Sequence, residues 1–254
     1  MTKTIALAGK GGTGKTTIAA LLIHSLLKNV PGPLLAIDAD PSTNLHLALG
    51  LRMPTTVGEV RETMAAEAQP GQLGVSISRH DYLTHEVQMA LEEGEQVDLL
   101  AMGRPEGQGC YCAANHLLRT IIDDMGRHYP YVVIDNEAGM EHLSRRTTRD
   151  VQHLLVISDP TRRGLVAAHR IADLSKELDV RVEHSYLILN QLRSEMPTEL
   201  LEYAQSLGIP ILGTIYDDEA LVEFDASGKP LVDVPDESPT YQSVSRMMGQ
   251  ILGS

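Results

Sequence analysis

A glycine-rich loop lies between an apolar strand and an apolar helix near the start of the chain, and it restricts the possible folds more than any other feature. The strand Thr4–Ala8 runs into Gly9-Lys-Gly-Gly-Thr-Gly-Lys-Thr-Thr17, and an apolar helical pattern follows at once. Glycines let successive N–H groups point inward at phosphate oxygens, and the start of a helix adds a positive end. The order of strand, loop and helix therefore predicts a phosphate-binding loop rather than a plain glycine turn.

Each position of this loop has a predicted task. Lys15 is placed to reach the β and γ phosphates, Thr16 supplies a hydroxyl for Mg²⁺, and Thr17 can reach the α phosphate. The residues expected to bind the nucleotide here are Gly11, Gly12, Thr13, Gly14, Lys15, Thr16 and Thr17. A nucleoside triphosphate with Mg²⁺ is the ligand that this loop predicts.

Short apolar runs alternate with longer helical patterns along the rest of the chain, which is typical of strands covered on both faces. The expected strands are Thr4–Ala8, Leu34–Ile37, Val97–Met102, Tyr131–Ile134, Leu154–Ile157, Tyr186–Leu189 and Ile211–Ile215. The expected helices are Thr16–Lys28, Asn115–His128, Arg163–Leu178, Pro197–Leu207 and Thr240–Leu252. This order predicts an α/β fold with a doubly wound, mainly parallel sheet flanked by helices.

The length of 254 residues favours one domain spanning residues 1–254, and no composition change marks a linker. The stretch Met53–Glu95 is harder to interpret because Gly, Pro and Gln interrupt it. We treat it as an insertion of mixed structure, with Val75–Ile77 as a weak strand candidate.

A second lysine inside the glycine loop, Lys10, exceeds what one subunit needs to bind one nucleotide. The loop resembles that of the deviant Walker A ATPases, the group of nitrogenase iron protein, MinD, ParA and metallocluster-assembly ATPases. The resemblance implies that Lys10 reaches the phosphates of ATP in a partner subunit. It therefore implies ATP hydrolysis by a homodimer, with Lys10 and Lys15 among the catalytic residues.

Two aspartates, Asp38 and Asp40, close the next apolar strand and match the first switch of this family. The resemblance implies that Asp40 positions or deprotonates the attacking water and that Asp38 lies near the metal. The alternative is purely structural, since Asp40 before Pro41 could cap a short helix toward Leu49.

The strand Tyr131–Ile134 delivers Asp135, as expected for a carboxylate that holds Mg²⁺ through water. The next residues, Asn136 to Gly139, match the second switch of the family. Asn190 closes the strand Tyr186–Leu189 where the family has its adenine-binding asparagine. Gln191 replaces the lysine that usually follows, which makes the preference for adenine less certain than phosphate binding.

The only two cysteines, Cys110 and Cys112, are separated by one residue, so an intramolecular disulfide would be strained. Two thiols are too few for a closed tetrahedral site, but two chains meeting at a two-fold axis would supply four thiolates to Zn²⁺ or Ni²⁺. The alternatives are two small apolar loop residues, or ligands of a bridging iron–sulfur cluster.

The Cys-Tyr-Cys motif, together with Gly139-Met-Glu-His-Leu-Ser-Arg-Arg146, resembles the nickel-insertion ATPases of carbon monoxide dehydrogenase, the CooC type. That resemblance implies Ni²⁺ or Zn²⁺ binding at Cys110 and Cys112 and a client metalloenzyme, carbon monoxide dehydrogenase. Nitrogenase-type electron transfer is disfavoured, because the stretch after the second switch contains no cysteine.

Charge and hydropathy argue against two other classes of partner. A formal net charge of −13 is atypical of a protein that coats nucleic acid. No apolar run is long enough to span a membrane and no signal peptide begins the chain, so we expect a cytoplasmic protein. The apolar stripe of the last helix, Val244, Met247, Met248 and Ile251, predicts core packing rather than lipid binding.

The alternative function is a spatial-organisation ATPase of the MinD or ParA type.

Overall fold

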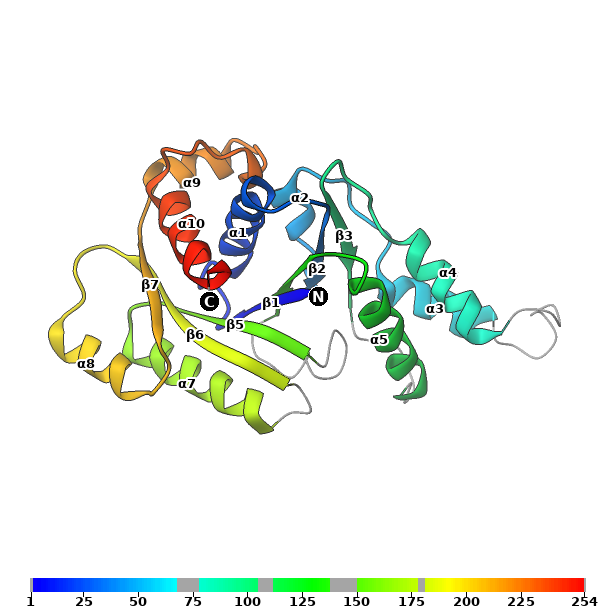
Figure 1. Cartoon of the computed structure of the whole chain (residues 1–254), viewed down its shortest axis with the longest axis horizontal. Coiled ribbons are helices and arrows are strands. Elements are labelled where there is room, and N and C mark those ends of the chain that lie inside the picture. The colour runs from blue at the N-terminus through cyan, green and yellow to red at the C-terminus, as the bar shows by residue number, and fades with distance from the viewer. Residues whose placement is uncertain (1, 68–77, 105–111, 138–149, 178–180, 254) are drawn as a thin grey trace.

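A seven-stranded parallel sheet forms the centre of the protein in the computed structural model, which describes residues 2–67, 78–104, 112–137, 150–177 and 181–253 (Figure 1). The strands lie in the order β3-β2-β4-β1-β5-β6-β7, and every named pair is parallel. They span β1 Lys3–Gly9, β2 Leu34–Ala39, β3 Val97–Ala101, β4 Tyr131–Asn136, β5 Asp150–Ser158, β6 Arg181–Leu192 and β7 Ile211–Tyr216. The predicted α/β fold is confirmed, and each expected strand is present; six of them extend beyond the expected bounds, whereas β3 ends at Ala101, one residue before the expected Met102.

Helices cover both faces of the sheet, as a doubly wound fold requires. One face carries α1 Lys15–Asn29, α2 Leu45–Leu49, α9 Glu219–Ala226, the 3₁₀ turn η1 Leu231–Asp233 and α10 Pro239–Leu252. The opposite face carries α3 Val57–Glu67, α4 Arg79–Met89, α5 Cys112–Gly126, α7 Arg162–Glu177 and α8 Thr198–Ser206. We call these the α1/α10 face and the α7 face.

Two apolar cores result, one under each layer of helices. Along β1, Ile5 and Leu7 belong to the core under α1, whereas Ala6 and Ala8 belong to the core under α7. Successive side chains of a strand point to opposite faces, so a strand with a core on both sides has to be apolar throughout. This explains why the strand signals are continuous runs rather than alternating patterns.

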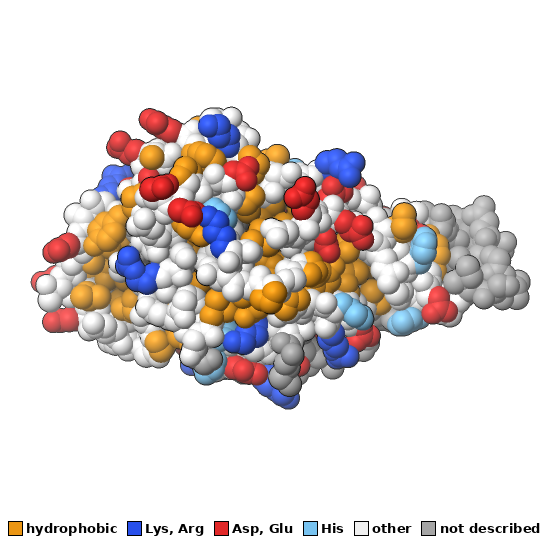
Figure 2. Space-filling model, turned by 45° about the horizontal axis from the view of Figure 1, so that its top comes forward, with side chains coloured by type: hydrophobic (Ala, Val, Ile, Leu, Met, Phe, Trp, Pro, Cys, Tyr) orange, Lys and Arg blue, Asp and Glu red, His pale blue; other side chains and the backbone are white. Residues whose placement is uncertain are grey.

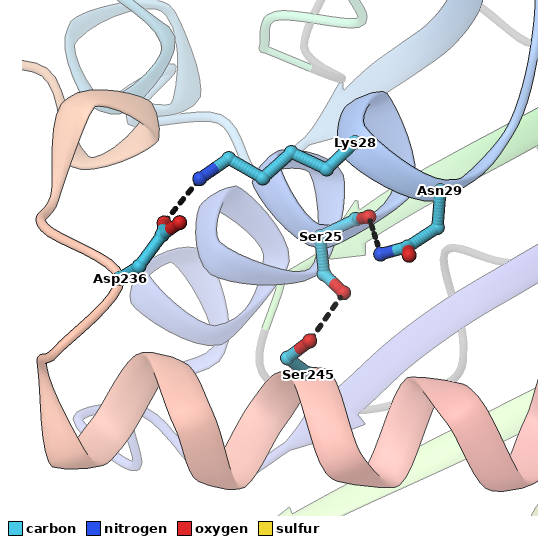
Figure 3. A network of polar contacts seen from close by, with 5 residues as sticks. All are labelled: Ser25, Lys28, Asn29, Asp236 and Ser245. Atoms are coloured by element: carbon cyan, nitrogen blue, oxygen red, sulfur yellow. Dashed lines mark hydrogen bonds and ion pairs between the residues drawn. The ribbon is translucent and has the colours of Figure 1, made fainter.

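The last helix, α10, packs along α1 as its apolar stripe predicts. Val244, Met247, Met248 and Ile251 are each 5% exposed or less. Polar contacts complete this junction: the Ser25 and Ser245 hydroxyls lie 3.1 Å apart, and Lys28 on α1 pairs with Asp236 (Figure 3). The stripe is therefore part of the core, as expected.

The described residues between positions 53 and 95 form two helices, α3 and α4, where we expected only an insertion of mixed structure. A capping box at the start of α3 was the available sequence signal for this helix. The Thr56 N–H and hydroxyl both donate to Glu59 Oε2, at 2.7 and 2.9 Å, and the Glu59 N–H donates to the Thr56 hydroxyl oxygen. Ser78 caps α4 through the Asp81 N–H. The weak strand candidate at residues 75–77 lies outside the described residues.

The start of α5 is also a correction, because this helix begins at Cys112 rather than at the expected Asn115. Cys112 is thus a helical residue and not part of a loop.

Acidic and basic side chains are interspersed with patches of apolar ones on the face shown in Figure 2. No helix in the described part of the chain is long and apolar enough to cross a bilayer.

Candidate nucleotide-binding site

The glycine-rich loop leaves the carboxyl end of β1 and enters α1 through two glycines in left-handed conformations. Gly12 has φ +80° and Gly14 has φ +86°, both in the region that glycine tolerates best. At Gly14 a Cβ atom would also lie 2.5 Å from the Asn190 Nδ2 atom. The N–H groups of the first turn of α1 lack intrahelical partners, as in any helix, so this turn presents donors to an anion.

The two lysines of the loop behave differently. Lys15 is 7% exposed, and its Nζ atom donates to the Lys10 carbonyl oxygen at 3.4 Å, as does the Thr13 hydroxyl at 2.9 Å. The Lys10 side chain is exposed, so only its backbone takes part in holding the loop. The structure thus places Lys15 within its own site and leaves Lys10 facing outward.

Asp135 and Asp38 come together from two strands at the edge next to the loop. They are direct register partners on β4 and β2, and the Thr16 hydroxyl donates to Asp135 Oδ2 at 2.6 Å. Burial raises the pKa of Asp135 to about 7 and that of Asp38 to about 6. The Thr16 hydrogen bond lowers the pKa of Asp135, whereas the charge of Asp38 raises it further.

This group of oxygens fits Mg²⁺. Asp135 is 1% exposed, and its Oδ1 atom has no hydrogen-bond partner among the described residues, so a buried acceptor is left for a cation or its water. Mg²⁺ prefers oxygen ligands and usually takes one or two from protein, with phosphates and waters completing its shell. The sparse set of Thr16, Asp135 and Asp38 matches that requirement, and Mg²⁺ would neutralise charge on the triphosphate.

Asp38 and Asp40 hold the first-switch segment through local hydrogen bonds. Asp38 Oδ2 accepts from the Leu45 N–H at 2.9 Å, at the start of α2, and Oδ1 accepts from the Asp40 N–H at 3.1 Å. Asp40 Oδ1 accepts from both the N–H and the hydroxyl of Ser42. The helix cap considered for Asp40 is thus provided by Asp38, and Asp40 stabilises a turn of its own.

Asn190 and Gln191 of β6 contact the backbone of the phosphate loop. Asn190 Nδ2 donates to the Thr13 carbonyl at 2.8 Å, and Gln191 Nε2 donates to the Gly12 carbonyl at 2.9 Å. Gln191 has φ +62°, an unusual backbone conformation for a residue other than glycine. Asn190 therefore lies at the site as expected, with its amide nitrogen bonded to the loop.

Asn136 is a site residue to which sequence reasoning assigned no role of its own. It is fully buried next to Asp135, and its Nδ2 atom donates to the Leu7 carbonyl of β1 at 2.8 Å. This bond ties the end of β4 to the strand that leads into the phosphate loop. Its position directly after the Asp135 carboxylate was the only available signal.

The predicted cysteine site and part of the second switch cannot be placed. Cys110 and residues 138–149, with Gly139 among them, lie outside the described residues, and for Cys112 only the backbone at the start of α5 is described. Within the described ranges, no three His, Cys, Asp or Glu side chains form a group that could hold a metal ion.

Comparisons with known proteins agree with this geometry. A model of the CobQ/CobB/MinD/ParA nucleotide binding domain matches residues 4–231. An uncharacterized ATP-binding protein of Methanocaldococcus jannaschii is 40% identical over 98% of both chains. The carbon monoxide dehydrogenase accessory protein CooC of Rhodospirillum rubrum is 32% identical over 88% of this chain and 87% of its own.

A solved structure of similar fold is the septum site-determining protein MinD of Pyrococcus horikoshii in complex with Mg-ADP. It has a TM-score of 0.67 and 24% identity, and the match covers 99% of this chain and 96% of that one. With the family model, the relatives and the phosphate loop in agreement, the chain belongs to the CobQ/CobB/MinD/ParA family of nucleotide-binding domains and is a P-loop ATPase.

Proposed function

We propose that the protein is an ATP-dependent metallochaperone that works as a homodimer, binds Ni²⁺ or Zn²⁺ through Cys110 and Cys112, and assists nickel insertion into carbon monoxide dehydrogenase. The observation that carries this proposal is the C-x-C pair in a chain that matches a carbon monoxide dehydrogenase accessory protein over 88% of its length. Thiolates suit Ni²⁺ and Zn²⁺, and two copies would supply four of them. The metal is cargo rather than a resident cofactor.

The nucleotide chemistry of this proposal uses residues from both copies. Lys15 and the loop N–H groups bind the triphosphate, Thr16 and Asp135 hold Mg²⁺, and water oriented by Asp40 attacks the γ phosphate in line. Lys10 of the second copy completes the pocket. The exposure of Lys10 supports this role: Lys15 is buried in its own site, whereas the Lys10 side chain is exposed and available to another molecule.

A covalent path connects the nucleotide site with the cysteine pair. Cys112 is the first residue of α5, and this helix leads into β4, which ends with Asp135 and Asn136. On the other side, the Met102 N–H, just after β3, donates to the Asp38 carbonyl at 2.8 Å. The cysteine segment therefore lies between one strand that bonds to Asp38 and a helix that leads to the strand of Asp135, which supports coupling between hydrolysis and metal release.

The second candidate is a spatial-organisation ATPase of the MinD or ParA type. The fold favours it as strongly, since MinD and ParA structures match with TM-scores of 0.67 to 0.72. Lipid docking of the kind expected from a terminal amphipathic helix is disfavoured, because the apolar stripe of α10 is buried against α1. Neither thiol has a task in this alternative.

Metal stoichiometry separates the two candidates. Purified protein, freed of metal with a chelator, is dialysed against Ni²⁺ or Zn²⁺, and bound metal and molecular size are measured with and without Mg-ATP. We expect one ion per dimer, and we expect Cys110→Ala with Cys112→Ala to abolish binding while ATP hydrolysis without metal persists. Lys10→Ala should keep ATP binding and lose ATP-dependent dimerisation.

The matched control is Ser25→Ala with Ser245→Ala, two small substitutions at the contact between α1 and α10 that should leave metal binding intact. Retention of stoichiometric metal by the double cysteine variant, or no metal binding by the unmodified protein, contradicts the metallochaperone role and leaves the second candidate. ATP-dependent dimers of the Lys10→Ala variant would contradict the cross-subunit site alone.

A further inference from the structure

A hollow of about 820 Å³ lies between the phosphate loop and helix α7. We call it the α7 groove, and its lining residues are Lys10, Arg162, Arg163, Val166, Ala167, Arg170 and Ile171. Three of these are apolar and the other four are cations. Residues 163, 166, 167 and 170 are spaced by three or four positions, so they lie along one side of the helix. The groove thus combines an apolar floor with a basic rim.

The basic residues of the groove have no acidic partner within the described part of the chain. Lys10, Arg163 and Arg170 form no ion pair with any residue that the structure describes, and Arg162 lies over the Tyr203 ring, 4.1 Å from its centroid. His169 and Lys176 of the same helix are different, because Asp173 pairs with both of them. Among the described residues of α7, the arginines that line the groove are therefore the cations without a carboxylate partner.

The position of these arginines is unfavourable for the isolated protein. Arg162 and Arg163 begin α7, whose first turn contains no acidic residue. A helix N-terminus is positive, so cations there are destabilising, and four neighbouring cations also repel each other. In a chain of net charge −13, such a cluster of cations is unusual. An anionic ligand would relieve both costs.

We propose that the α7 groove docks an acidic amphipathic helix of another protein. Its apolar side would cover Val166, Ala167 and Ile171, and its carboxylates would pair with Arg163 and Arg170, whose guanidinium groups suit bidentate contacts. Nucleic acid fits less well, because phosphate backbones offer nothing to an apolar floor. Because Lys10 lines the same groove, docking reaches the loop that binds ATP. This inference goes beyond metal carriage and does not require it.

A peptide of defined chemistry tests the groove directly. The probe is a fluorescent helical peptide with leucine on one side and glutamate on the other, titrated into the full-length protein and followed by anisotropy. Replacing the glutamates of the probe by glutamine should weaken binding, as should raising the salt concentration. Arg163→Glu with Arg170→Glu should lower the affinity by about tenfold for each lost pair.

Matched variants make the result specific to the groove. Lys176→Glu with Arg181→Glu changes the net charge equally, beyond the groove, and should leave binding unchanged. Arg163→Gln with Arg170→Gln provides an uncharged version with an intermediate loss of affinity, and circular dichroism checks that each variant is folded. Basal ATP hydrolysis should be similar in all three double variants and in the unmodified protein.

Several outcomes would overturn the proposal. The groove does not recognise acidic groups if the glutamine peptide binds as tightly as the glutamate peptide. The same conclusion follows if the Arg163→Glu, Arg170→Glu variant binds the glutamate peptide as tightly as the unmodified protein does. Duplex DNA binding with the same dependence on both arginines would assign the groove to nucleic acid. Loss of ATP-dependent dimerisation in this variant, without peptide binding to the unmodified protein, would assign it to a second copy of the chain.

Discussion

The helices on the two faces of the sheet differ in how much of their surface is buried. On the α1/α10 face, every residue of α1 from Ile18 to Leu26 is buried, and all of them except His24 and Ser25 are apolar. On the α7 face, α7 buries only one stripe, including Leu165, Ala168 and Ile171, and turns its arginines outward. A helix that is apolar all round must be enclosed, whereas an amphipathic one leaves a side for other molecules.

This difference indicates a division of tasks. The helix that carries the phosphate loop is held on all sides by β-strands, α2, η1 and α10, so the anion-binding turn has a rigid support. The hollow beside α7 and a second one of about 690 Å³ between α4 and α5 both lie on the other face. The α1/α10 face therefore supplies stability, and the α7 face offers surfaces for binding.

The largest expected effect comes from shortening a side chain inside the enclosed helix. Leu22→Ala on α1, where the side chain is 1% exposed, should lower the free energy of unfolding by about 2–5 kcal/mol through lost burial and a cavity. Leu201→Ala on α8, where leucine is 36% exposed, makes the same chemical change on the α7 face and should cost about 0.5 kcal/mol. Urea unfolding without nucleotide measures both, and equal losses would remove the contrast between the faces.

A smaller effect is expected at the polar contact between α1 and α10. The buried Ser25 hydroxyl and the half-buried Ser245 hydroxyl bond to each other at 3.1 Å, so removing one leaves the other without this partner (Figure 3). Ser25→Ala should cost about 1 kcal/mol, and adding Ser245→Ala should cost little more. Thr84→Ala on α4, whose hydroxyl makes a solvent-exposed hydrogen bond to the His80 carbonyl, is the control and should change stability by less. Full additivity in the double-mutant cycle would mean that the two hydroxyls do not interact.

The smallest effect concerns pH. Burial and the charge of Lys28 lower the pKa of His24, which stacks on Tyr241 and whose Nδ1 atom has no partner among the described residues. Because the folded pKa is below the unfolded value of about 6.5, this contribution to stability is present above pH 6.5 and is lost as the pH falls through the folded pKa.

Thermal unfolding between pH 7.5 and 5.5 measures this contribution. His24→Phe keeps the stacking and removes the titration, so it should lose fewer degrees of Tm on acidification than the unmodified protein. His85→Phe on the exposed α4 should follow the unmodified protein instead. If the His24→Phe variant lost as many degrees of Tm on acidification as the unmodified protein, His24 would not be the source of the acid sensitivity.

Sequence reasoning succeeded wherever the signal was local. The phosphate loop, the seven strands and the boundaries of α7, α8 and α10 follow from residues close together in the chain, and the structure places them within one or two positions, apart from strand ends. It failed at α3 and α4, where the capping signals at Thr56 and Ser78 were overlooked among Gly, Pro and Gln residues. It also placed the start of α5 three residues too late, which kept Cys112 out of the helix.

By itself the sequence determined the anion-binding loop, the apolarity of the strands and the presence of two lysines, because glycine conformations, hydrophobic burial and charge act over a few residues. Only the tertiary structure decided that Asp38 lies opposite Asp135, that Gln191 bonds to Gly12, and that Lys10 shares a groove with the arginines of α7. These pairs are separated by about a hundred residues or more, and the order of strands in the sheet brings them together. That order follows from packing two layers of helices on one sheet, which no local pattern specifies.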